Sequence, residues 1–329
     1  MATPPMAPAP TPAPTVEPET RRAVRPEPTA AGLRRLRRLR RRRALVGWGF
    51  AAPFTVLFVA FMALPVLASL AMSVTDMRST DLRNPFAVEF VGARNFVRLF
   101  GDELFHRAAV NTAIFVVVGV PLTIVAGLAA ASGLNSGLIR FRSLFRVGFY
   151  LPVVTSIVAI AVVWRFLLDP QAGPVNNLLR LLGVDGPNWL ANPTTALPSI
   201  TVLAVWRNFG FLMVIFLAGL QAIPAHLYEA ARLDGAGRWQ QFRYVTLPML
   251  RPTLLFGAVV TGIGYLQLFE EPFVMTQGGP LSSTLSVSYH IYNQFGFGNY
   301  GYAAAASWVL FVAIVGLSVL QFRLLRARD

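Results

Sequence analysis

Cysteine and lysine are both absent from this chain of 329 residues. Without cysteine it can form neither a disulfide nor a thiolate nucleophile, and cysteine-ligated metal sites are excluded. Without lysine it cannot contain the Gly-Lys-Ser/Thr loop that holds nucleotide phosphates in P-loop ATPases. The three histidines, His106, His226 and His290, are too far apart to resemble a set of zinc ligands. No catalytic triad or pair of catalytic carboxylates is evident, so the chain is not predicted to be an enzyme.

Charged residues are also scarce, at 13% of the chain, whereas soluble domains contain about 25%. Hydrophobic residues make up 55%, which is typical of an integral membrane protein. The formal net charge of +14 comes from 29 arginines, and eleven of these precede Leu45. The basic character therefore belongs mainly to an N-terminal tail.

That tail, residues 1–43, has two parts. Residues 1–30 are rich in Pro and Ala and bury too little apolar surface to fold, so they are predicted to be disordered. Residues 33–43 form an arginine run that could bind nucleic acid. Because an apolar segment follows at once, the run is better read as an anchor beside anionic lipid headgroups, worth about 1 kcal/mol per arginine.

Six apolar segments follow, each long enough for a helix across a hydrocarbon core of about 30 Å. The sequence therefore predicts an all-α integral membrane protein with six transmembrane helices in residues 44–329. The segments are 45–72, 109–134, 147–168, 198–222, 252–274 and 302–322.

The distribution of arginine between the loops predicts the orientation. Twenty-one arginines fall on the side that holds both termini and the 223–251 loop, and six fall on the other side. Because cytoplasmic loops are enriched in Arg and Lys, both termini and this loop are predicted to be cytoplasmic.

The 223–251 loop is polar and has its own helical signals. A first helix is predicted before Gly235, which suits a sharp stop. A second, amphipathic helix should follow, and Pro248 and Pro252 are expected to end it. Its apolar residues recur at three-residue intervals, at Trp239, Phe242 and Val245. A plain hairpin lying on the membrane surface would also explain this second helix.

Four charged residues fall inside the predicted spans, three of them well away from a span end or in pairs. Arg207 lies in segment 198–222, and Glu270 and Glu271 lie late in segment 252–274. Each costs about 2.5–3.5 kcal/mol to insert, so an ion pair between Arg207 and one glutamate is expected. The pair could serve helix packing or line a polar cavity. Arg165, near the end of segment 147–168, is expected to reach the outer headgroups.

The 223–251 loop resembles a known family. Glu229-Ala230-Ala231, then Gly235, then Leu247-Pro248, is similar to the "EAA" loop of binding-protein-dependent ABC importer permeases. The flanking sequence most resembles the carbohydrate-uptake branch, the MalF-type sugar permeases, which have the type I importer fold. Further similar stretches, such as "MTQGGPLSST" at residues 275–284, extend the resemblance over about residues 45–325.

The resemblance implies a multi-subunit machine in the bacterial cytoplasmic membrane. This chain would work with a second homologous permease, two copies of an ABC ATPase and an extracytoplasmic substrate-binding protein, which would face residues 73–108 and 277–300. ATP and Mg²⁺ would be used by the ATPase, and no cofactor would be bound by this chain. Glu229 would pair with a basic group of the ATPase, while Trp239 and Phe242 would tie the loop to the membrane domain. The implied coupling residues are Glu229, Ala230, Ala231, Asp234, Gly235, Trp239, Phe242, Leu247 and Pro248.

The resemblance also implies a solute site near mid-membrane. Its expected residues are Arg207, Asn208, Phe211, Thr261, Gly264, Tyr265, Leu268 and Glu270. Aromatic and amide groups suit a di- or oligosaccharide, and a glycerol-phosphate-type or amino-sugar solute is the alternative cargo. A different class also stays open: a stand-alone secondary carrier would use the intramembrane Glu and Arg residues as a proton relay.

Overall fold

A computed structural model describes residues 47–83, 88–136 and 140–325, so the tail of residues 1–43 lies outside the described part. Within that part the chain is mostly helical, and the only strand-like feature is one bridge between Thr75 and Phe90. This confirms the all-α fold. The elements are η1 (Val59–Ala63), α2 (Leu64–Ser73), η2 (Ser79–Arg83), α3 (Arg94–Phe100), α4 (Glu103–Asn135), α5 (Arg142–Val154), α6 (Ile157–Leu167), α7 (Pro174–Leu181), α8 (Ala196–Gln221), α9 (Ala225–Leu233), α10 (Arg238–Gln241), η3 (Phe242–Thr246), α11 (Leu247–Leu266), α12 (Glu270–Met275), α13 (Val287–Gly296) and α14 (Tyr300–Leu325).

Five helices of the described residues are long and apolar enough to cross a membrane, and one bent pair passes the same test when taken together. The five are Gly47–Ser73, Glu103–Asn135, Ala196–Gln221, Arg238–Leu266 and Tyr300–Leu324. They match five of the six predicted segments, and the bent pair, α5 with α6, matches the remaining one.

The first span crosses the boundary between two compact units, Met1–Leu64 and Pro65–Asp329. No residue in its most apolar window is buried. The described part of the first unit is a single apolar helix that contains the π-helical turn η1. This helix alone forms no hydrophobic core within the described part of the first unit.

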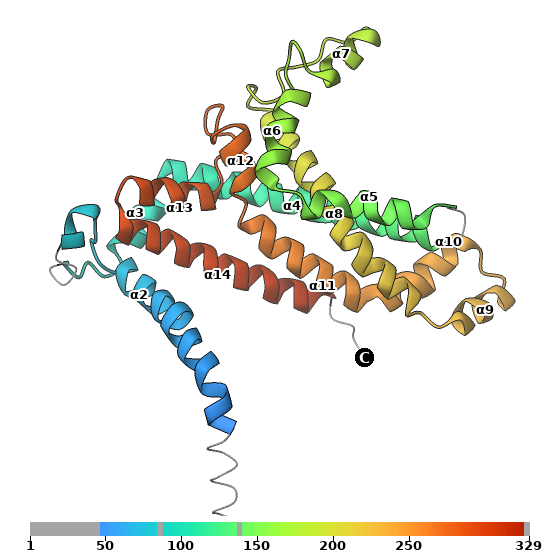
Figure 1. The fold of residues 1–329 in the computed structure, drawn as a ribbon, viewed down its shortest axis with the longest axis horizontal. Coiled ribbons are helices and arrows are strands. Elements are labelled where there is room, and N and C mark those ends of the chain that lie inside the picture. Colours follow the sequence, from blue (N-terminus) through green and yellow to red (C-terminus); the bar gives the residue numbers. More distant parts are fainter. Residues whose placement is uncertain (1–46, 84–87, 137–139, 326–329) are drawn as a thin grey trace, which may run out of the picture. The chain divides into compact units, whose positions relative to one another are not determined.

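The second unit is built around the long contact between α4 and α8 (Figure 1). At Gly127 of α4 an added Cβ would lie 2.8 Å from the Cβ of Leu212 and 3.1 Å from the carbonyl oxygen of Phe209. Only a glycine therefore lets the two backbones approach this closely, as small residues do between membrane helices. α11 packs against α4 and α14, and α5 packs against α8.

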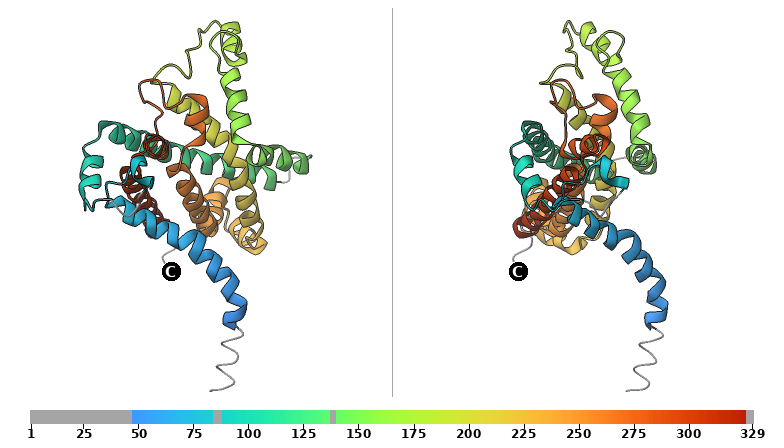
Figure 2. Two further views of the ribbon diagram at one scale, coloured as in Figure 1. Left: turned by 60° about the vertical axis from the view of Figure 1, so that its left-hand side comes forward. Right: turned by 90° about the vertical axis from the view of Figure 1, so that its left-hand side faces the viewer.

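The third predicted span is confirmed as a span, but it is bent rather than continuous. α5 and α6 meet at a bend of 100°, which all three ribbon views show (Figures 1 and 2). Pro152 lacks an N–H and crowds the preceding turn, and it lies just before the break. Thr155 then adopts extended backbone angles, and Ser156 is also non-helical, between the two helices.

The fifth predicted span also differs from the structure at both ends. The second loop helix does not end at Pro248 or Pro252, because α10, η3 and α11 form one continuous helix, Arg238–Leu266. At the other end the helix stops at Leu266, so Glu270 and Glu271 belong to the separate short helix α12.

Pro272 explains this second break. In a continuous helix it could not donate to the carbonyl of Leu268, which lies four residues earlier. In the structure the Ser286 hydroxyl donates to that carbonyl instead. A neighbouring side chain thus satisfies the backbone group that the proline leaves unpaired, as membrane interiors require.

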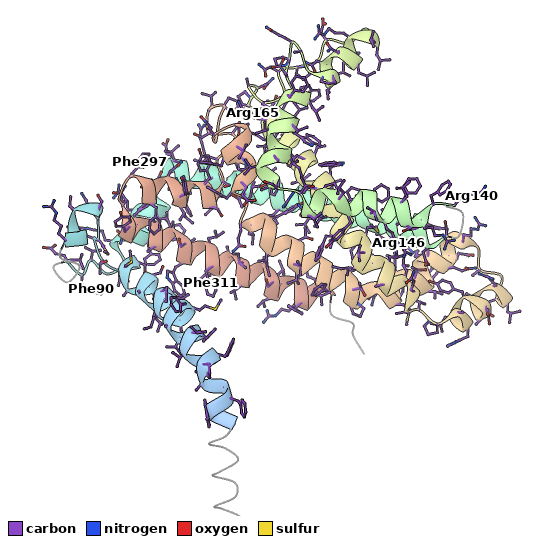
Figure 3. All side chains as sticks on the ribbon, in the orientation of Figure 1. Phe90, Arg140, Arg146, Arg165, Phe297 and Phe311 are labelled. Atoms are coloured by element: carbon purple, nitrogen blue, oxygen red, sulfur yellow. The ribbon has the colours of Figure 1, made fainter. Side chains whose placement is uncertain are left out.

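The second unit has two distinct ends. Arg140 and Arg146 lie at the end that carries α9 and α10, and Phe297 lies at the opposite end with α3 and α13 (Figure 3). The arginine-bearing loop before α5 and the polar 223–251 loop therefore share one end, as the arginine distribution predicted.

Candidate functional site

A cavity of about 420 Å³ lies between α8, α11 and α12. It brings together all eight residues that the resemblance implied for the solute site. Five further residues complete the lining: Phe115, Val260, Gln267, Phe269 and Glu271. We call this space the central cavity. Sequence spacing could not have found Phe115, because it comes from a different helix, α4. Glu271 could have been found, since it neighbours Glu270.

Tyr265 lines the central cavity, but its side chain is mostly buried against neighbouring helices. Its side chain is only 5% exposed, and its ring packs on Phe115 with centroids 4.7 Å apart. Its hydroxyl forms a hydrogen bond of 2.8 Å with the Thr123 hydroxyl. Gly119 makes room for the ring, because a Cβ there would lie 2.7 Å from Tyr265 Cε2. The ring is therefore rigidly placed by α4.

Arg207 does not form the ion pair that its sequence position suggested. It lines the central cavity together with Glu270 and Glu271, but neither glutamate forms an ion pair with it. Its Nε is buried and has no hydrogen-bond partner among the described residues. A buried donor without a partner is costly, so this N–H is available to a polar group inside the cavity.

The first helix of the 223–251 loop ends as predicted. α9 closes in a Schellman motif, in which the Ala236 N–H donates to the carbonyl of Ala231 at 2.8 Å and the Gly235 N–H donates to Arg232 at 3.0 Å. Gly235 has φ +78°, the left-handed conformation that favours glycine. The next helix starts with the Gln240 side chain accepting from the Gly237 N–H at 2.7 Å. These contacts give the polar loop a defined shape.

One face of α9 is attached to the rest of the unit, and the other face is open. The Tyr228 hydroxyl bonds the Thr246 hydroxyl at 3.0 Å, and Leu227 and Tyr228 pack against the core between α4, α8 and α11. Glu229 is exposed, and Leu233 is 89% exposed. The fixed helix thus presents an acidic and an apolar side chain outward.

The structure does not place Trp239 where the resemblance suggested. Trp239 is 70% exposed, and its ring stacks on Phe242 with centroids 5.7 Å apart. Trp239 therefore does not tie the loop to the rest of the unit. Tyr228 and Thr246 anchor it instead, and sequence reasoning missed both because their pairing depends on the tertiary fold. Ala230, Asp234 and Gly235 are exposed, while Ala231, Leu247 and Pro248 are partly buried. Their coupling role stays a prediction.

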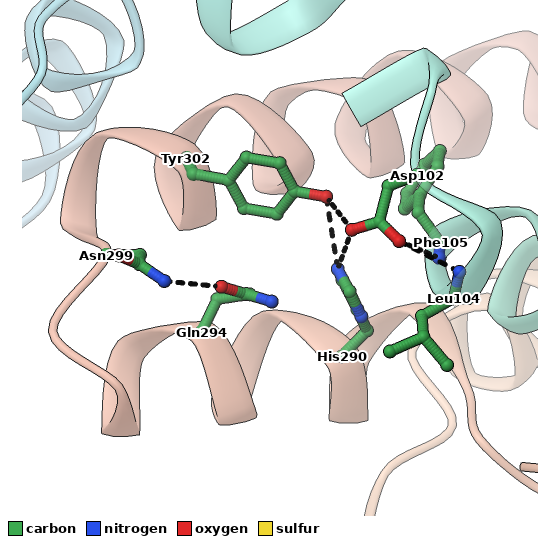
Figure 4. A network of polar contacts seen from close by, with 7 residues as sticks. All are labelled: Asp102, Leu104, Phe105, His290, Gln294, Asn299 and Tyr302. Carbon is green, nitrogen blue, oxygen red and sulfur yellow. Dashed lines mark hydrogen bonds and ion pairs between the residues drawn. The ribbon is translucent and has the colours of Figure 1, made fainter. Parts of the chain in front are cut away.

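At the opposite end of the unit a polar network joins four elements (Figure 4). Asp102 caps α4 by accepting from the N–H groups of Leu104 and Phe105, and it accepts from the Tyr302 hydroxyl at 2.6 Å. His290 Nε2 lies 3.4 Å from that hydroxyl and 3.8 Å from the same carboxylate. The guanidinium of Arg98 lies over the Tyr302 ring. The network fixes α3, α13 and the starts of α4 and α14 to one another.

Comparisons with known proteins agree with this architecture. A family model described as "Binding-protein-dependent transport system inner membrane component" matches residues 119–328. The chain belongs to that family. It is therefore a membrane permease component of an ABC importer, as the loop resemblance implied.

Individual relatives cover nearly the whole protein. The lactose transport system permease protein LacF of Rhizobium radiobacter is 41% identical over 86% of this chain and 94% of its own length. The trehalose/maltose transport system permease protein MalF of Thermococcus litoralis is 32% identical over 88% of this chain and 97% of its own. The fold of this permease is also that of a solved importer, described as a bacterial alginate ABC transporter in complex with an alginate pentasaccharide-bound periplasmic protein. That match has a TM-score of 0.72 and 26% identity, and it covers 87% of this chain and 95% of the other.

Proposed function

We propose that this permease carries a di- or oligosaccharide inward across the cytoplasmic membrane by alternating access. The observation that supports a sugar is the lining of the central cavity, which sets aromatic rings beside an arginine, an asparagine and two glutamates. Its volume lies within the range of about 300–1,000 Å³ that is usual for small-molecule sites. The lactose and trehalose/maltose relatives point to the same class of solute.

The energy for transport would come from a separate ATPase, since this chain contains no lysine for a Walker A loop. One of the two copies of that ATPase would bind α9 through its exposed face, which carries Glu229 and Leu233. The most apolar window of the first span has no buried residue, and its apolar surface suits lipid and a second homologous permease. An extracytoplasmic binding protein would deliver the sugar at the end that carries α3 and α13.

The balance of charge in the central cavity argues against a phosphate-bearing cargo. Arg207 alone supplies positive charge there, while Glu270 and Glu271 would repel an anion. A neutral sugar, or an amino sugar as the second candidate, fits this lining better.

The test is reconstitution of this permease with its second permease, ATPase and binding protein in proteoliposomes. We expect lactose to accumulate only when ATP and the binding protein are both present. Accumulation driven by a proton gradient in the absence of ATP would instead establish a secondary carrier.

A further inference from the structure

A second cavity, of about 630 Å³, lies beyond α12 from the central cavity. It is formed by the end of α6, the turn that follows α6, the loop before α8 and the segment after α12. None of its residues lines the central cavity. We call it the outer pocket, because it lies on the side that the arginine distribution predicts to be extracytoplasmic.

The charged groups of the outer pocket are held in place by the backbone around them. Asp169 accepts from the N–H groups of Ala172 at 2.7 Å and Gln171 at 2.9 Å. These two hydrogen bonds lower the pKa of Asp169, so its carboxylate is ionised at neutral pH. Arg165 donates through Nη1 to the carbonyl of Val274 at 3.3 Å. A guanidinium carries five N–H donors, so this bond leaves most of the fork for a ligand.

Amide groups and apolar side chains complete the outer pocket. Asn188 and Gln277 add amides, and Phe166, Leu190 and Met275 add apolar surface. Gln277 has φ +52°, which is strained for a residue other than glycine. Strained backbone of this kind costs about 1–3 kcal/mol and concentrates at functional sites. Preplaced donors and acceptors above an apolar wall are the features that recognise a hydroxyl-rich solute.

α12 is the one described helix that lines both cavities, and it lies between them. Its first two residues, Glu270 and Glu271, line the central cavity, and its last residue, Met275, lines the outer pocket. α12 packs against α6, and the Arg165–Val274 hydrogen bond joins the two helices. A solute that leaves the outer pocket past α12 would therefore arrive at the central cavity.

We propose that the outer pocket is a first binding site for the transported sugar, occupied before the central cavity. The inference rests on the proposed function as a sugar permease, and it adds a site that the family resemblance did not imply. Arg165 and Asp169 would bind hydroxyl groups as donor and acceptor, and Phe166 would contact a C–H face of the ring.

The absence of cysteine from this chain makes a direct test possible. Three single-cysteine variants of the reconstituted complex are compared: Ala191→Cys in the outer pocket, Thr261→Cys in the central cavity, and Leu181→Cys on the exposed face of α7. The reaction rate of each with a membrane-impermeant thiol reagent is measured with and without millimolar lactose. The complex that carries the natural chain gives the background from partner subunits.

We expect lactose to slow modification of Ala191→Cys at least threefold and to leave Leu181→Cys unchanged. Adding Arg165→Gln or Asp169→Asn to Ala191→Cys should abolish this protection while the thermal unfolding midpoint of the complex stays the same. The same additions should leave the protection of Thr261→Cys intact.

Failure of this proposal is distinguishable from failure of the proposed function. A complex that accumulates lactose, but whose Ala191→Cys reacts equally fast with and without it, overturns the outer pocket and leaves the sugar permease standing. Protection of Ala191→Cys by the sugar-free binding protein, but not by lactose, would overturn it too, since the pocket would then be a protein interface. Absence of ATP-dependent lactose uptake in the natural complex bears on the proposed function.

Discussion

Arg207 is the residue whose surroundings are hardest to explain without a ligand. Its Nε is buried and finds no partner in the described part of the chain, and it lines the central cavity beside two glutamates with which it forms no ion pair. A protein that needed this arginine only for packing would be expected to pair it, because unpaired buried donors are costly. This environment is consistent with the proposed role of Arg207 as a donor to solute hydroxyls.

Replacement of Arg207 by alanine should therefore weaken solute binding. Hydrogen bonds to charged groups are worth about 1.5–3 kcal/mol, so the apparent affinity for lactose in the uptake assay should fall roughly 10- to 100-fold. The matched control is Arg146→Ala, which removes an exposed arginine of α5 outside the cavity. Equal uptake kinetics for Arg207→Ala and the natural protein would remove this residue from the solute path.

The close contact at Gly210 leads to a prediction about the stability of the permease. A Cβ at this position would lie 1.8 Å from the carbonyl oxygen of Phe149, a backbone atom that cannot rotate away. Gly210→Ala should therefore push α8 away from α5 and cost about 1–3 kcal/mol or more. Gly316→Ala on α14 is the control, because its Cβ would meet nothing within 4 Å and alanine favours a helix. The thermal unfolding midpoint of the complex should fall only for Gly210→Ala, and equal midpoints would show that the crossing is looser than described.

At the scale of elements, the sequence predicted where the membrane helices lie but not where they bend or break. Hydropathy alone located every span, although it misplaced both ends of the fifth, since about twenty apolar residues must cross the bilayer. It could not reveal the bend between α5 and α6, because the prolines of α4 and α11 leave those helices continuous while Pro152 lies beside a sharp break. The consequence of a proline depends on which neighbours satisfy the freed backbone groups, and neighbours are a tertiary property.

The candidate sites divide in the same way. Family resemblance gathered eight residues that the fold does place around one cavity, but it could not supply Phe115, which arrives from α4. Likewise the left-handed Gly235 was readable from the sequence, whereas the Tyr228–Thr246 hydrogen bond was not.

The loop formed by α9 and α10 gives the main prediction for an element. Reversal of charge in Glu229→Arg should leave the permease inserted and folded, because Glu229 is exposed. It should reduce ATP-dependent lactose uptake at least tenfold if the exposed face of α9 contacts a basic group of the ATPase. Asp185→Arg, an exposed reversal outside this loop, is the control and should transport normally. Unchanged uptake by Glu229→Arg would refute the docking role.

The contact of α13 with α14 and α4 should weaken in acid. Burial lowers the pKa of His290 below its ordinary value, although the nearby Asp102 carboxylate opposes this shift. Burial by itself would raise the pKa of Asp102, but the hydrogen bonds from Tyr302, Leu104 and Phe105 outweigh it and lower that pKa. In the unfolded chain His290 then binds a proton below about pH 6.5, whereas in the folded chain it becomes protonated only at a lower pH. Stability should fall as the pH drops from 6.5, well before Asp102 matters below about 3.9.

The measurement is the thermal unfolding midpoint of the complex between pH 7 and pH 5. His290 is 2% exposed, so His290→Gln should flatten this part of the profile. His106→Gln removes an exposed histidine on α4 and should leave the profile as it is. A profile that is identical for all three proteins would mean that His290 does not titrate differently on unfolding.

At the scale of the whole molecule, the arginine distribution predicts which end faces the cytoplasm. Asp234→Cys lies in the loop after α9 and Phe297→Cys lies at the opposite end, and no natural cysteine competes with either. In intact cells a membrane-impermeant reagent should modify Phe297→Cys, and Asp234→Cys only after permeabilisation. The reverse pattern would invert the topology and remove α9 from any cytoplasmic ATPase.

One helix connects the two functional regions without a break. Residues Arg238–Leu266 run from the polar loop to the wall of the central cavity, and at 1.5 Å per residue these 29 residues make a rod of about 43 Å. A tilt of roughly 5° at the loop would carry Thr261 and Tyr265 several ångströms at the far end of such a lever arm. A small stroke by a nucleotide-driven motor could thus be magnified, by leverage alone, into a displacement comparable to the width of a sugar ring.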